Sequence, residues 1–242
     1  MHTSCKPLVA LTAVAALVAG NAMAEVEYEI HAGYTNEYLF RGLNLGQNLV
    51  ETGADVTAAV QGVGLSAGVW YGSFKDNSVP GLGSPNQDAS ELDLYGQISK
   101  DFGQLTGSIG YIYRYFDSTD NTRNTQEVYF GLARQVLGID TSLIYFQSVE
   151  GNNNGYSEFS LGKRFALSSC LALNCGTALG YLAEKGQLTA LTTKLALDWG
   201  FTHNATLSPF VKWSIALSDD IDTAYYGSKN QFVGGMLLRV TF

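Results

Sequence analysis

The stretch QLTGSIGYIYRYF, residues 104–116, alternates between two chemically different faces. One face carries the large apolar and aromatic side chains Leu105, Ile109, Tyr111, Tyr113 and Tyr115. The other carries Thr106, Ser108 and Arg114. Successive side chains of a strand point to opposite sides, so this stretch is predicted to be a strand with one apolar and one polar face.

The same alternation recurs along most of the chain, and no convincing amphipathic helix interrupts it. It predicts strands at residues 26–36, 50–60, 64–74, 90–100, 104–116, 126–136, 139–149, 156–167, 174–184, 188–200, 205–217 and 231–242. Each is about ten residues long, which is the length a tilted strand needs to cross a bilayer.

The connections between these strands also alternate in character. QGV, DFG, LG, SSCLALN and THNA are short, whereas KDNSVPGLGSPNQDAS, DSTDNTRNT, EGNNNG and SDDIDTAYYGSKN are long and polar; EKGQ breaks the pattern because it is short where a long loop is expected. Short turns at one end and long loops at the other are typical of bacterial outer-membrane barrels. Residues 37–49 lie between the first two predicted strands, and Gly42 is expected to let the chain bend into a loop there.

The N-terminus has the features of an export signal. Lys6 precedes the apolar run LVALTAVAALVAG, and Ala22-Met23-Ala24 follows it. The run is short for a spanning helix, so residues 1–24 are predicted to be a cleaved signal peptide. The net charge of −8 becomes more negative without Lys6 and argues against nucleic acid as a partner.

The last strand, QFVGGMLLRVTF, ends the chain on an aromatic residue in phase with its apolar face. Val240 and Phe242 resemble the C-terminal signal of bacterial outer-membrane barrels, which the barrel-assembly machinery recognises. A soluble sandwich has the same alternation with its apolar face inward and is the alternative. The signal peptide, the alternating loop lengths and the C-terminal signal together favour an all-β fold. We predict a closed antiparallel transmembrane β-barrel of about twelve strands over residues 25–242. Its expected location is the Gram-negative outer membrane, in contact with lipid.

In hydrocarbon every backbone polar group must be paired, so strand 26–36 is expected to pair with strand 231–242. The polar face then points inward. It is predicted to carry Glu27, Glu29, His31, Glu51, Asp55, Glu91, Asp93, Arg114, Glu127, Glu158, Arg164, Lys194, Asp198, Lys212 and Arg239. Lys100, Arg134 and Lys163 fall on the lipid-facing phase near strand ends, where long side chains reach the headgroups.

Two interpretations of the inward charges stay open. They form ion-pair networks that fill a narrow interior, or they form acidic and basic walls of a pore that orients a solute. Eight-stranded barrels are filled and sixteen-stranded ones hold a channel, so about twelve strands lie between the two cases. The expected function is a channel, or porin, for small polar solutes. The alternatives are a barrel hydrolase or acyltransferase acting on lipid or peptide, and a non-conducting structural barrel.

No recognisable catalytic motif supports the enzyme alternative. GxSxG and HExxH are absent from the sequence, and His31 is expected to bond a lumen carboxylate. We expect no cofactor and no metal site. Cys170 and Cys175 lie in SSCLALNC of an exported chain, and a disulfide between them is the favoured interpretation.

The segment HAGYTNEYLFRGLNLGQN, residues 31–48, resembles the opening of a family of uncharacterised proteobacterial outer-membrane proteins proposed to act in transport. Phe40, Arg41, Gly42, Leu43 and Gln47 match its motif, and Asn44 stands where Ser is usual. The resemblance implies an outer-membrane barrel with a transport role and no catalytic residues.

The sequence leaves two roles open for Arg41. If the alternation of strand 26–36 continues, Tyr38 and Phe40 face lipid, and Glu37 and Arg41 face the lumen. Arg41 then forms a structural ion pair with Glu37 or Glu51, or it selects a solute.

Overall fold

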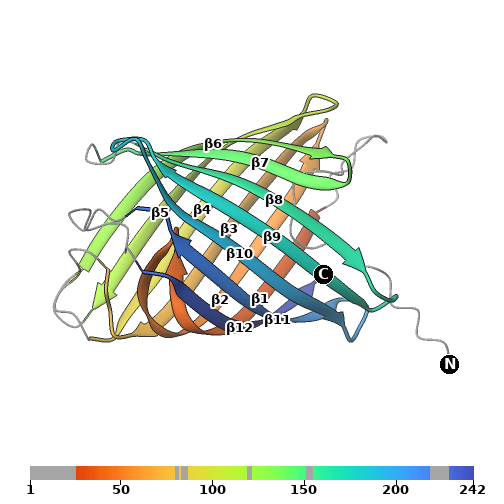
Figure 1. Ribbon diagram of the computed structural model, residues 1–242. Helices are drawn as coiled ribbons and strands as arrows, with labels where there is room; N and C mark the ends of the chain where they lie inside the picture. The colour runs from red at the N-terminus through yellow and green to blue at the C-terminus, as the bar shows by residue number, and fades with distance from the viewer. Residues whose placement is uncertain (1–25, 80–81, 83–86, 119–121, 151–154, 219–228) are drawn as a thin grey trace.

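The computed structural model is a closed barrel of antiparallel strands (Figure 1). It describes residues 26–79, 82, 87–118, 122–150, 155–218 and 229–242, so the predicted signal peptide lies outside the described residues. Its twelve strands are β1 (Val26–Phe40), β2 (Leu43–Val60), β3 (Val63–Lys75), β4 (Ala89–Asp101), β5 (Thr106–Ser118), β6 (Thr122–Val136), β7 (Ile139–Ser148), β8 (Tyr156–Ala166), β9 (Leu171–Leu182), β10 (Gln187–Gly200), β11 (Ala205–Ala216) and β12 (Gln231–Thr241). The predicted fold class is confirmed.

The strands follow one another round the barrel in sequence order, and β12 closes the sheet on β1 as expected. His31 lies opposite Arg239, and Tyr34 opposite Met236. The Phe242 amide donates to the Tyr28 carbonyl at 2.9 Å, which extends the seam to the end of the chain. No helix in the described part of the chain has the length and hydropathy to span a bilayer.

The two predicted faces are found on the barrel. In β5, Ile109, Tyr111 and Tyr115 are exposed on the outside, while Arg114 and Phe116 are buried inside. Lys100, Arg134 and Lys163 are exposed on the outward phase. The barrel therefore presents an apolar outer surface and a polar interior, the reverse of a soluble sandwich.

Both termini lie at one end of the barrel, which we call the terminal end; the other is the loop end. The terminal-end connections are short, and two are two-residue turns, Gln61–Gly62 and Leu137–Gly138. All four of these residues have positive φ, as a type I′ hairpin turn requires.

The predicted disulfide between Cys170 and Cys175 is wrong, because no bond joins these two residues. The expected loop is mostly strand: β9 begins at Leu171, and the connection from β8 has only four residues. Cys175 pairs with Lys163 and Leu195 inside the ladder. At about 3.3 Å per residue, five strand residues separate the α-carbons by roughly 16 Å, whereas a disulfide needs less than about 7 Å.

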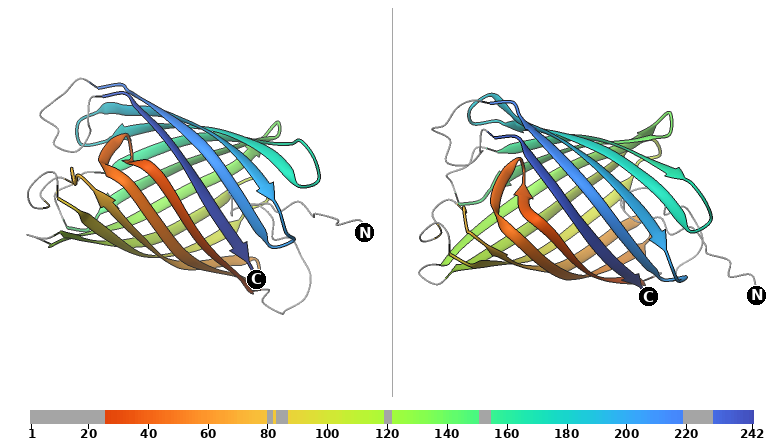
Figure 2. Two further views of the ribbon diagram at one scale, coloured as in Figure 1. Left: turned by 90° about the horizontal axis from the view of Figure 1, so that it is seen from below. Right: turned by 60° about the horizontal axis from the view of Figure 1, so that its bottom comes forward.

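The loop predicted at residues 37–49 is also wrong. β1 and β2 continue through this stretch and meet in a two-residue turn, Arg41–Gly42. β1 last pairs with β12 at Thr35, and a register shift interrupts the β1–β2 ladder between Tyr38 and Leu39. Such irregularities bend a strand and increase its twist, and the red-orange β1–β2 pair curves away from its neighbours in Figure 2.

The stem of this hairpin packs inside the barrel. Tyr38, Leu45 and Leu49 are buried in one cluster with residues of β3, β4, β5 and the β3–β4 connection, namely Phe74, Val79, Leu82, Ala89 and Phe116. The expectation that Tyr38 and Phe40 face lipid is wrong for the same reason. Once the hairpin leaves the wall, both of its faces meet protein.

Candidate functional site

The lumen holds all the inward-facing residues predicted from the alternation. Each lies on the inner phase of its strand, and Arg41 reaches the lumen from the hairpin turn. The structure divides them into three groups: a network at the hairpin tip, a cluster around His31, and a basic wall on β10 and β11.

Arg41 is the centre of the tip network. Its Nη1 and Nη2 each donate to one oxygen of the Glu127 carboxylate, on β6, at 2.8 Å. Arg114 Nη1, on β5, donates to the same carboxylate at 2.7 Å, and Asp93 lies 3.5 Å from Arg114 Nε. The Arg41, Glu127 and Arg114 side chains are 9%, 6% and 6% exposed. The expected partners Glu37 and Glu51 are therefore wrong; the true partner is 86 residues away.

Aromatic rings enclose the Arg41 guanidinium. Its Cζ lies 4.2 Å from the ring centroid of Phe146, 4.5 Å from that of Tyr156 and 4.9 Å from that of Phe40. These distances are within the range of cation–π attraction. The turn conformation places Arg41 here, with φ of 50° at Arg41 and 87° at Gly42.

The rest of the tip reaches the opposite wall. A β-carbon on Gly42 would lie 2.6 Å from Cβ of Ala190, on β10, so only glycine fits this approach. Leu43 packs against the buried pair Tyr156 and Leu182. Asn44 Nδ2 lies 3.5 Å from Gln231 Oε1, on β12. The hairpin thus enters the lumen near the loop end and contacts both sides of the barrel.

A buried hydrogen bond fixes the hairpin stem. Tyr38 Oη donates to Glu91 Oε2, on β4, at 2.6 Å. Tyr38 also packs edge-on against Phe74, with ring centroids 5.2 Å apart. The stem is therefore held by apolar packing, the Tyr38–Glu91 hydrogen bond and a backbone hydrogen bond from Ser78 N to Leu45 O at 2.9 Å, whereas an ion pair and ring faces hold Arg41 at the tip.

The second group lies nearer the terminal end. His31 Nδ1 is 3.5 Å from Asp55 Oδ2 and 3.9 Å from Glu29 Oε1, so the predicted carboxylate partners are found. Tyr95 Oη donates to Asp55 Oδ1 at 2.6 Å. One donor atom from each of Glu29, His31 and Asp55 lies within 4.8 Å of the others, so among the residues that the structure describes these three could hold a metal ion.

The third group carries positive charge. Lys194, on β10, lies opposite Lys212, on β11. Asp198, below Lys194, accepts from Arg164 Nη1 at 2.7 Å and from Ser208 Oγ at 2.8 Å. On β2, Glu51 Oε2 accepts from Trp70 Nε1 at 2.8 Å. The buried Arg239 and the partly buried Glu158 complete the charged interior.

Sequence reasoning placed Glu127 and Glu91 inside the barrel but gave them no special role, and it missed Tyr38, Phe146 and Tyr156. The last two lie on inward phases of β7 and β8, yet aromatic residues there look no different from ordinary lumen filling. Their function depends on the hairpin entering the lumen, which the alternation does not encode.

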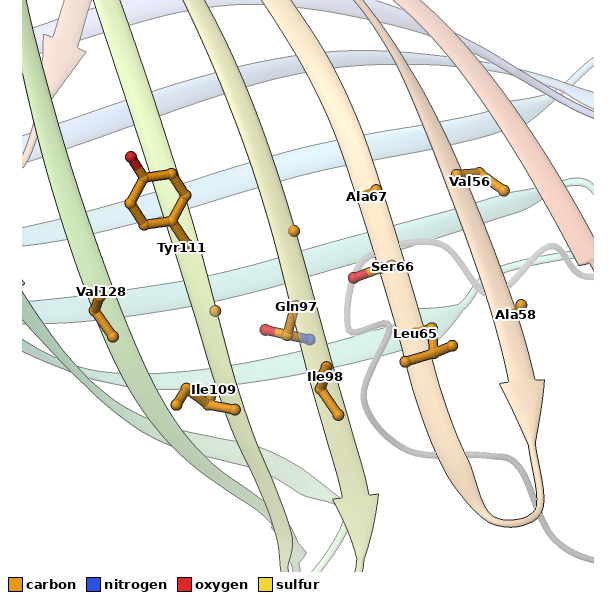
Figure 3. Close-up of a pocket in the computed structure, with 12 residues that line it drawn as sticks. Val56, Ala58, Leu65, Ser66, Ala67, Gln97, Ile98, Ile109, Tyr111 and Val128 are labelled. Carbon is orange, nitrogen blue, oxygen red and sulfur yellow. The ribbon is translucent and has the colours of Figure 1, made fainter.

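A groove on the outside of the barrel is separate from these groups. It crosses β2 to β6, and most of its lining is on the lipid-facing phase, where small residues such as Ala58, Ala67 and Gly96 leave a hollow (Figure 3). Ile98 and Ile109 beside it are about half exposed. This groove belongs to the lipid-facing surface and lies outside the barrel interior.

Comparison with known proteins identifies the class of barrel. Residues 19–234 match the model of a family described as bacterial protein of unknown function (Gcw_chp). No curated protein matches the sequence.

Among solved structures, the fold is similar to an outer-membrane channel from Pseudomonas putida F1 (9% identity, TM-score 0.54, covering 98% of this chain and 100% of that chain). It is also similar to LpxR from Salmonella typhimurium (7%, TM-score 0.52, 89% and 100%) and to the NanC porin (12%, TM-score 0.50, 89% and 98%). At such identities the likeness shows the fold, that of a barrel of the bacterial outer membrane. The loop end is then the external side, since periplasmic turns of such barrels are short.

Proposed function

The chain belongs to the Gcw_chp family of bacterial proteins of unknown function, and we propose that it is an outer-membrane channel for small polar solutes whose external mouth is closed by the β1–β2 hairpin. Solutes pass when the hairpin tip leaves the lumen. The observation that carries this proposal is the ionic contact of Arg41 with Glu127, which joins the tip of a two-residue turn to the opposite wall.

The tip contacts are of a kind that can be exchanged for water. Arg41 is bound by a carboxylate and by ring faces, and Asn44 by an amide. Water can replace the hydrogen-bond partners of all these groups. The stem residues Tyr38 and Leu45 pack in an apolar cluster on the β3–β5 side. The tip is therefore the part of the hairpin that can move while the stem acts as its hinge.

The lumen below the tip supports a polar path. Glu51 and Asp55 on β2 face a different sector of the wall from Lys194 and Lys212 on β10 and β11. Acidic and basic walls of this kind orient a dipolar or charged solute as it passes. A purely structural interior would need its charges only in neutralised pairs.

The test is single-channel recording in planar bilayers with the wild type, Arg41→Gln and a control, Arg134→Gln. Arg134 lies on the outward phase of β6, the strand that carries Glu127. We expect rare, brief openings from the wild type and from the control, and long openings from Arg41→Gln. Heat-modifiable migration in gels establishes that each variant is folded.

Folded Arg41→Gln that never conducts at any voltage contradicts the proposal. The structural barrel and the barrel enzyme acting on lipid or peptide then become the better explanations.

A further inference from the structure

The basic wall contains two lysines that repel each other. Lys194 and Lys212 are directly opposite in the β10–β11 ladder, and both point into the lumen. Like charges at such positions are destabilising. Both ammonium groups lie over the ring of Phe210, with Nζ–centroid distances of 4.4 Å and 5.3 Å. The shared ring brings the two positive charges to one place on the wall.

Nearby acids do not neutralise this pair. Within the described residues, no carboxylate oxygen lies within 4.0 Å of either ammonium group. The field of Glu51 reaches both lysines, but Trp70 holds this carboxylate at 2.8 Å. The Asp198 carboxylate already accepts a hydrogen bond from Arg164 Nη1.

A third cation adds to the excess of positive charge. Arg239, on β12, acts electrostatically on Lys194, and its buried Nη1 has no hydrogen-bond partner. Lys194 and Lys212 both keep part of their surface exposed to the lumen.

The lysine pair also lies next to the hairpin tip. Thr192 and Ser214, which share a hydrogen bond of 2.9 Å, occupy the next inward positions toward the external side. A β-carbon on Gly42 would lie 4.0 Å from Ser214 Oγ. A solute bound by the lysines would therefore lie one layer of residues below the closing segment.

We propose that Lys194 and Lys212 form a binding site for small anions that carry carboxylate or phosphate groups. The two ammonium groups bind the anion, since charge-assisted hydrogen bonds are the strongest available here. Phe210 provides an apolar floor for the carbon skeleton of an organic acid. A role of this anion site in transport rests on the proposed channel function, because the bound anion would be the solute that passes the hairpin.

The site is tested by isothermal titration of citrate and of inorganic phosphate into the full-length mature barrel in zwitterionic detergent. The variants are Lys194→Gln, Lys212→Gln and the pair together. Lys100→Gln with Lys163→Gln is the matched control, since both of these lysines lie on the outward phase. We expect each single variant to weaken binding at least tenfold, and the double variant to show none. Lys194→Arg should retain binding.

Equal affinity of the folded double variant and the wild type overturns the site, and so does the absence of saturable binding of both probes to the wild type. The titration needs no conductance, so the two proposals fail separately. A barrel that conducts without binding anions refutes only the anion site. A barrel that binds them and never conducts refutes the channel.

Discussion

Replacement of Glu127 by glutamine tests the closure of the lumen most directly. The substitution keeps the shape of the side chain and removes the charge that two guanidinium groups share, at 2.8 Å from Arg41 and 2.7 Å from Arg114. Both arginines are nearly buried, at 9% and 6% side-chain exposure, so water cannot compensate in place. Arg114 keeps Asp93 at 3.5 Å, whereas Arg41 loses the negative charge and one of its two acceptor oxygens, because an amide nitrogen in its place cannot accept.

The size of the effect follows from this burial. Removing one member of a buried ion pair costs about 3–5 kcal/mol when the other member stays buried. The hairpin tip can avoid this cost by leaving the lumen, so the closed state loses about 3 kcal/mol relative to the open state. At about 1.4 kcal/mol per factor of ten, the ratio of closed to open barrels falls roughly 100-fold.

Two assays measure this ratio independently. Single-channel recording gives the open probability, and trypsin added to the outside of proteoliposomes reports whether the bond after Arg41 is accessible. The wild type should resist cleavage there, and Glu127→Gln should be cut and should conduct. Arg134→Gln serves again as the control. If Glu127→Gln stays closed by both assays while folded, the ion pair does not hold the hairpin and the reasoning is wrong.

Three further substitutions test other parts of the barrel. Gly42→Ala should open the channel, because its β-carbon would lie 2.6 Å from that of Ala190 at a φ of 87°; adding Ala190→Gly removes the contact but not the strain of the positive φ, and should restore part of the closure, as measured by open probability. Tyr38→Phe leaves the buried Glu91 carboxylate without its 2.6 Å hydrogen bond and should cost about 1–3 kcal/mol in urea unfolding; an unchanged midpoint would show that water replaces the hydroxyl. Deletion of Phe242 should lower the amount of folded barrel in outer-membrane fractions, measured by heat-modifiable migration, if the last residue is part of the assembly signal.

The barrel could be predicted from the sequence because the pattern that specifies it, the alternation of apolar and polar residues, lies within each strand and recurs from strand to strand. In β5 and β12 the alternation of apolar and polar residues fixes which side chains face lipid, and Arg114 and Arg239 point inward as expected. The pairing of β1 with β12 followed from the requirement that no backbone group stay unpaired in hydrocarbon. Both rules can be applied with knowledge of only the neighbouring residues in the sequence and the solvent that surrounds the strand.

The proposed closure could not be predicted because it depends on a contact between residues that are far apart in the sequence. Nothing near Arg41 in sequence indicates Glu127, and Glu37 and Glu51 were closer along the chain. Asn, Gly and Gln in LNLGQN suggest a loop by composition, whereas the structure has an extended hairpin with positive φ at Asn48. The disulfide prediction failed similarly, since the spacing of Cys170 and Cys175 suits a loop and not a strand.

The contacts of residues 40–43 explain how the hairpin tip would close the barrel. Phe40 lies against two guanidinium groups, at 4.9 Å from Arg41 and 5.2 Å from Arg114. Arg41 binds the β6 wall, Gly42 allows contact with β10, and Leu43 packs on the buried Tyr156 of β8. Each of the four residues makes a different contact, and we expect the replacement of any one of them to weaken the hold on the tip. Because the Glu127 carboxylate already binds Arg41, the proposed channel would recognise its solute through the charges below the tip, and Arg41 would control access to them.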